Sequence, residues 1–119
     1  MTSQERTELI EAARVFLDEL FSTGVPLQEL LNHGTFPEGW PERYCAFVEQ
    51  VSACHDANEP LPREVVAVIY NASVYCTKRY NDWCSHWGSK NPATFDQVNQ
   101  VRWAGDRLVL GPFYPIAEN

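Results

Sequence analysis

The stretch from Ile69 to Trp87, IYNASVYCTKRYNDWCSHW, decides the fold class of this chain. At the 3.6-residue period of an α-helix, its apolar side chains recur on one side. They are Ile69, Ala72, Cys76, Tyr80, Trp83 and Trp87. A polar set, Tyr75, Arg79, Asp82 and His86, recurs on another side. The pattern predicts one long helix with an apolar stripe beside a polar stripe.

The same periodicity and its stop signals predict helices elsewhere in the chain. Thr2 followed by Glu5 resembles a capping box that opens a helix near residue 4, which Gly24 ends. Proline-initiated segments predict a short helix over residues 26–33, a third over 41–54 and the long fourth over 62–85. The run DANEPLP, residues 56–62, separates the third helix from the fourth.

The sequence from Asn91 onward is compatible with two different structures. Asn91-Pro92 resembles a cap and first helical residue, which favours a short fifth helix followed by an extended tail through GPFYP. The alternation of VRW-AGD-RLVL, residues 101–110, also fits two strands around a turn. We expect a single-domain, mainly α bundle of four to five helices over residues 1–119, with the hairpin as the rival for this end.

Charge is concentrated in the first half of the chain. Residues 1–60 hold eleven acids and three bases, whereas residues 61–119 hold five acids and six bases, within a net charge of −7. Such a surface repels phosphate backbones, so direct nucleic-acid binding is disfavoured. It attracts a basic protein patch and speeds encounter with it.

The N-terminal residues MTSQERTELIEAA are charged where the apolar core of a signal peptide would lie. No run reaches the roughly 18 apolar residues of a membrane span. These features predict a cytoplasmic protein that does not enter a membrane, with its four cysteines reduced.

The spacing of the cysteines and histidines does not support a metal site or a catalytic thiol. Cys54, His55, Cys84 and His86 lack the C-x₂₋₄-C or H-x₃₋₅-H spacing through which one loop presents two ligands. We therefore expect no metal site and no cofactor, and we interpret the cysteines as packed thiols.

Three function hypotheses remain, and the first is a binding module. In charge and size the chain resembles small acidic immunity proteins and inhibitors that block basic partners, a likeness that covers no motif and assigns no residue. The residues expected to contact such a partner are Glu8, Glu11, Asp18, Glu42 and Glu49, with Trp40 as an aromatic anchor. The alternative for Trp40 is that it covers the core together with Phe36.

The other two hypotheses are an assembly subunit and a ligand-binding or enzymatic domain. In the latter, Tyr75, Arg79, Asp82 and His86 would face a pocket, with Asp82 orienting His86 across one helical turn. The competing interpretation is a solvated helix face with ordinary i,i+4 partners. We rank the binding module first and the enzyme last, and oligomeric state stays open.

Overall fold

Five α-helices and one π-helical turn make up the computed structural model, which describes residues 1–56 and 58–110. The elements are α1 (Ser3–Asp18), the π-helical turn η1 (Glu19–Thr23), α2 (Val25–His33), α3 (Trp40–Cys54), α4 (Arg63–Trp87) and α5 (Pro92–Leu110). These two described ranges contain no strand, which confirms the mainly α class. None of the helices described in them is long and apolar enough to cross a membrane.

The predicted helix boundaries have the expected physical causes. The Thr2 hydroxyl accepts a hydrogen bond from the Glu5 amide at 3.1 Å, and the Glu5 carboxylate accepts one from the Thr2 amide at 2.7 Å. This capping box satisfies amides that the first turn of α1 leaves unpaired. At the other end, a left-handed Gly24 follows η1, a wider turn that the sequence pattern did not predict.

Residues 101–110 are helical, so the hairpin reading of that segment is wrong. Helical spacing buries Val98 and Val101 on one face of α5 and brings Gly105 against Ile69 and Ser73 of α4. The fifth helix is consequently longer than the short one expected. The extended tail through GPFYP lies outside the described residues.

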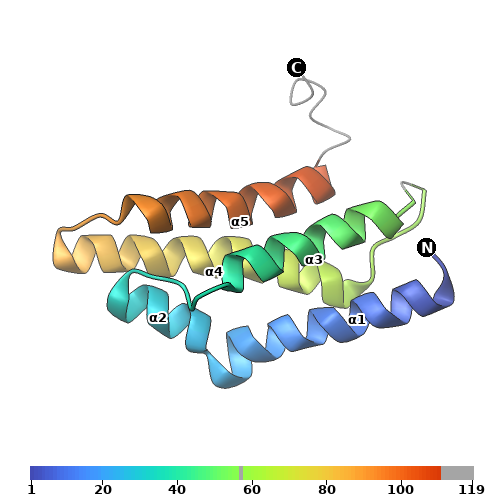
Figure 1. Cartoon of the computed structure of the whole chain (residues 1–119), viewed down its shortest axis with the longest axis horizontal. Helices are drawn as coiled ribbons and strands as arrows, with labels where there is room; N and C mark the ends of the chain where they lie inside the picture. The colour runs from blue at the N-terminus through green and yellow to red at the C-terminus, as the bar shows by residue number, and fades with distance from the viewer. Residues whose placement is uncertain (57, 111–119) are drawn as a thin grey trace, which may run out of the picture.

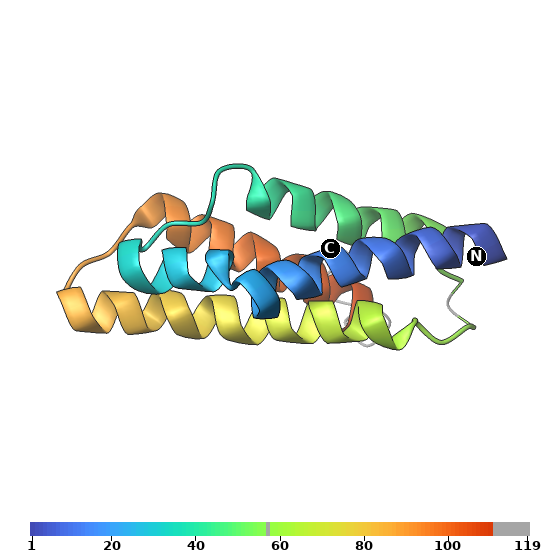
Figure 2. The ribbon, with the colours of Figure 1, turned by 90° about the horizontal axis from the view of Figure 1, so that it is seen from below.

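The long helix α4 packs against α1, α2 and α5, whereas α3 packs against α1 and α5. In Figure 1, α4 and α5 lie alongside each other, and α2 lies over the C-terminal part of α4. Figure 2, seen from below, shows α1 running between α3 and α4. Arg43 of α3 links this helix to the end of α1. Its guanidinium donates a hydrogen bond to Glu19 of η1 at 2.8 Å and lies over the Phe16 ring of α1.

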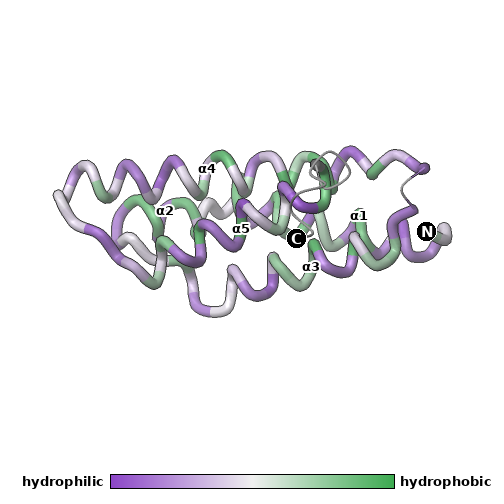
Figure 3. Tube along the Cα trace, turned by 90° about the horizontal axis from the view of Figure 1, so that it is seen from above, coloured by the Kyte–Doolittle hydropathy of each residue, from purple (hydrophilic) through white to green (hydrophobic). Residues whose placement is uncertain are grey.

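The core follows the predicted apolar faces, which appear as alternating green and purple along the tube in Figure 3. Ile69, Ala72, Cys76 and Tyr80 are buried as the stripe predicts. Trp87 breaks the pattern at 62% exposure, because it is the last residue of α4 and projects beyond the core.

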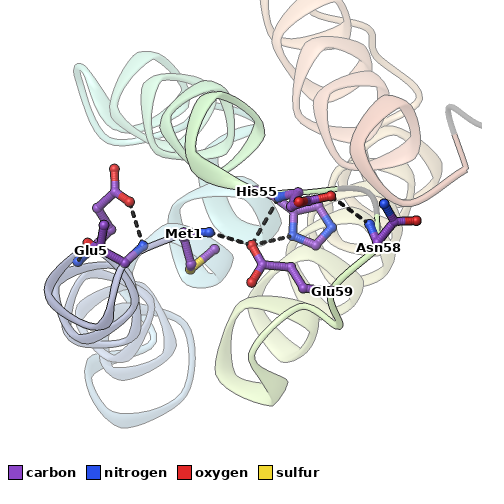
Figure 4. A network of polar contacts seen from close by, with 7 residues as sticks. Met1, Glu5, His55, Asn58 and Glu59 are labelled. Carbon is purple, nitrogen blue, oxygen red and sulfur yellow. Dashed lines mark hydrogen bonds and ion pairs between the residues drawn. The ribbon is translucent and has the colours of Figure 1, made fainter.

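The start of α1 is tied to the loop after α3 by a carboxylate (Figure 4). Glu59 accepts hydrogen bonds from the Met1 α-ammonium at 2.7 Å and from the Asp56 amide at 3.0 Å. The Asp56 amide, followed by the Met1 ammonium, lowers the pKa of the Glu59 carboxyl. Its ionised form therefore stabilises the folded chain.

This contact predicts a pH-dependent effect of Glu59→Gln. Because folding lowers the pKa of Glu59, its contribution is present above the unfolded value, about 4.3, and is lost as pH falls through the folded value. Thermal melts should show a lower Tm than wild type near neutral pH and a gap that shrinks below about pH 4. Glu38→Gln, at an exposed loop position, is the control. A gap of equal size at both ends of the pH range would contradict this role.

Candidate functional site

The acids predicted on the first helix share one outer face. Glu8, Glu11 and Asp18 are exposed, with exposed Val15 between them at helical spacing. The opposite side of α1 carries its buried residues, Leu9, Ala13 and Phe16. The burial of that side turns the three carboxylates outward.

The acids predicted on the third helix are also turned outward. Glu42 and Glu49 lie seven residues apart on α3 and are exposed. The buried residues of α3, among them Tyr44, Phe47 and Val51, occupy the opposite side. Glu49 also lines a hollow between α3 and α5.

Other acids of the first half are engaged within the chain. Glu5 caps α1 and Glu59 binds the Met1 ammonium. Glu19 pairs with Arg43 at 2.8 Å. In the second half, Glu64 of α4 pairs with Arg14 of α1 at 3.3 Å. Within residues 1–56 and 58–110, the ion pairs include none of Glu8, Glu11, Asp18, Glu42 and Glu49.

Trp40 is not a surface anchor, and that part of the expected contact set is wrong. Its side chain is 1% exposed, stacked at 5.5 Å between the rings of Phe36 and Tyr44. Phe16 meets it edge-on at 5.8 Å. Left-handed Gly39 precedes the helix and turns the chain so that Trp40 starts α3 facing the core.

The polar stripe of α4 divides into two parts. Tyr75 and Arg79 are half-buried and line a hollow of about 310 Å³ where α1, through η1, turns into α2. Leu20, Phe21, Leu27 and Leu31 form its apolar wall, and Gln28 adds an amide. Phe21 lies edge-on to Tyr75, with ring centroids 5.9 Å apart.

The other two members of the stripe do not join this hollow. Asp82 pairs with Lys78 at 3.3 Å, one turn back along α4. His86 is exposed and packs edge-on against Trp87, with ring centroids 4.9 Å apart. The expected Asp82–His86 hydrogen bond is not among those of the described residues, so an oriented imidazole is not formed here.

A second hollow, which the sequence analysis missed, lies between α3 and α5. Its volume is about 470 Å³, and its rim includes Cys45, Glu49, Trp103 and Arg107. Trp103 is 70% exposed. Gln100, Trp103 and Arg107 recur at helical spacing, a signal that the open choice between a short helix and two strands for this segment obscured.

The four cysteines are free thiols, and the surroundings of Cys76 and Cys45 keep these two protonated. Burial raises the pKa of the Cys76 thiol to about 12, and burial with the nearby Glu49 and Glu42 carboxylates raises the pKa of Cys45. A thiol is nucleophilic only as the thiolate, so neither is poised for catalysis. Across the described ranges, no group of three or more His, Cys, Asp and Glu residues could hold a metal ion.

Comparison with known proteins yields no relative: no family model, no curated protein and no solved structure matches this chain. The candidate sites are therefore argued from geometry and charge.

Proposed function

We propose that this protein is a binding module that docks on a basic protein partner through the outward acids of α1 and α3. The contact residues are Glu8, Glu11, Asp18, Glu42 and Glu49. The observation that carries this proposal is the division among the acids of the first half. Three of them, Glu5, Glu19 and Glu59, are used in a cap or ion pairs, whereas these five are exposed and outside the ion pairs of the described residues.

The spacing suits an extended basic surface on the partner. At a rise of about 1.5 Å per residue, Glu8 and Asp18 lie roughly 15 Å apart along α1. Charges spread over such a length steer a basic partner at low salt and lose that effect as salt screens them. Their main contribution is to the association rate.

The apolar part of the contact comes from Val15 once Trp40 is assigned to the core. Val15 is 54% exposed and lies between Glu11 and Asp18 on the same helix face. An apolar side chain between acidic ones matches the usual anatomy of a protein–protein interface, which has an apolar centre and a polar or charged rim.

The specific form of this proposal is a cytoplasmic inhibitor of a basic toxin or nucleic-acid enzyme. An acidic face that covers a basic substrate-binding surface blocks it by occupying the place of the nucleic-acid phosphates. Loss of the captured partner's activity at one-to-one stoichiometry tests this form.

The test compares two charge reversals of equal size. Tagged wild-type protein, Glu11→Lys and Asp96→Lys are used to capture partners from the native lysate at low salt and are eluted with a salt gradient. Each variant raises the net charge by the same amount, but Glu11 lies on the α1 face and Asp96 is exposed on α5. Affinity for the captured basic partner, measured with purified proteins, should fall about tenfold for Glu11→Lys, or about 1.4 kcal/mol.

The salt dependence of binding should also flatten for Glu11→Lys and stay near wild type for Asp96→Lys. Equal weakening by the two variants would mean that only the net charge matters and would contradict docking through α1. Recovery of the protein with no partner would contradict the proposal as a whole.

A further inference from the structure

The hollow between η1, α2 and α4 combines an apolar wall with one positive charge. Leu20 and Phe21 reach it from η1, and Leu27 and Leu31 reach it from α2. Phe21 is 53% and Leu31 38% exposed, so apolar surface is open to solvent at its rim. Its volume of about 310 Å³ is at the small end of the roughly 300–1,000 Å³ of ligand pockets.

The charge in this hollow is the Arg79 guanidinium. The nearest acid along the same helix face, Asp82, pairs with Lys78. None of the residues that line the hollow is acidic, and no ion pair within the described ranges includes Arg79. The guanidinium of half-buried Arg79 therefore pairs with no carboxylate of residues 1–56 and 58–110.

The neighbouring polar groups complete a donor set. Tyr75 contributes a phenol and Gln28 an amide, and both line the same hollow as Arg79. A guanidinium binds a carboxylate through two parallel N–H···O bonds, a geometry stronger and more selective than a single contact.

We propose that this hollow binds a monocarboxylate with an apolar body. The Arg79 guanidinium holds the carboxylate, and the apolar body lies against Leu20, Leu27 and Leu31. A free carboxylic acid and the C-terminus of an apolar peptide share this chemistry. The proposal is independent of the acidic docking face, because none of the five proposed contact acids lines the hollow.

The experiment is an NMR titration of ¹⁵N-labelled protein with octanoate and, as its neutral counterpart, octanamide. Octanoate should shift amides in residues 20–31 and 75–79, with a dissociation constant between about 10 μM and 1 mM. It should bind at least tenfold more tightly than octanamide. An acetylated Leu-Phe dipeptide with a free C-terminus distinguishes the sources: tighter binding than octanoate assigns the site to peptide ends.

Variants of residues that line the hollow separate the contribution of the Arg79 charge to octanoate binding from that of the apolar wall. Arg79→Gln should abolish the preference for octanoate over octanamide, whereas Arg79→Lys should keep part of it. Arg102→Gln, an exposed arginine on α5, is the matched control and should keep the wild-type preference. Leu31→Glu places a carboxylate at the half-exposed rim, where it should compete for Arg79 and block octanoate.

Three outcomes would overturn the proposal. They are equal binding of octanoate and octanamide, an unchanged preference in Arg79→Gln, and shifts confined to the hollow between α3 and α5. The amide spectra of both hollow variants report whether each remains folded, and Leu31→Glu supplies an independent test if Arg79→Gln does not fold. Because the readout is binding of defined small molecules, its failure would leave the docking proposal untouched.

Discussion

Trp40→Ala is expected to lower the free energy of unfolding by about 3–5 kcal/mol, the largest loss of any single side-chain truncation that we predict here. The indole is buried and stacks on Phe36 and Tyr44 with interplanar angles of 7° and 11°. Truncation removes both stacked contacts and the edge contact with Phe16. It leaves a cavity at the start of α3, where α1 and α3 meet.

Urea unfolding followed by far-UV circular dichroism measures this loss. Trp103→Ala is the control, because Trp103 is 70% exposed and its truncation should change stability by less than about 0.5 kcal/mol. Trp40→Phe should fall between the two, since the buried indole nitrogen of Trp40 has no hydrogen-bond partner among the described residues and its removal costs no bond there. Similar midpoints for Trp40→Ala and Trp103→Ala would refute the assignment of Trp40 to the core.

Gly34→Ala is expected to cost roughly 2–4 kcal/mol, from two separate causes. The residue ends α2 with φ of +67°, in the left-handed region that disfavours any Cβ. A Cβ built there would also lie 2.5–2.6 Å from ring carbons of Trp83. Accommodating it requires the indole to move away from the loop after α2.

Gly39→Ala measures the cost of the left-handed backbone conformation alone. Gly39 has φ of +79°, but a Cβ there meets no atom of residues 1–56 or 58–110 within 4 Å, so its cost should be only the roughly 1–2 kcal/mol of the left-handed conformation. The excess for Gly34→Ala over Gly39→Ala measures the collision with Trp83. Trp83→Ala in the Gly34→Ala background should recover part of that excess. Equal costs for the two glycines would show that Trp83 exerts no steric constraint.

The helices could be predicted from the sequence because their signals are local. The capping box at Thr2 and Glu5 and the break at residues 56–62 each depend on neighbours along the chain. The apolar stripe of α4 failed only at its end, where Trp87 extends beyond the core. Residues 101–110 were ambiguous because their alternation fits both periods, and packing of Gly105 against α4 selects the helix.

The sites were harder to predict, because they depend on contacts between elements. The outward direction of Glu8, Glu11 and Asp18 follows from helical spacing within α1. The burial of Trp40 depends on rings from α1 and from the loop before α3, and no spacing shows that. Likewise, Tyr75 and Arg79 were predicted on one helix face together with Asp82 and His86, but the π-helical turn that brings Phe21 beside Tyr75 was not.

Because the tryptophans are unequally buried, the intrinsic fluorescence of this protein can report on binding. Trp40 is sealed among aromatic rings and should emit at short wavelength, whereas Trp87 and Trp103 face water and should emit at long wavelength. Trp103 stands at the rim of the hollow between α3 and α5, with Glu49 on the facing helix. A partner that covers α3 would shift the red component of the fluorescence and leave the blue component in place, so docking can be followed without a label.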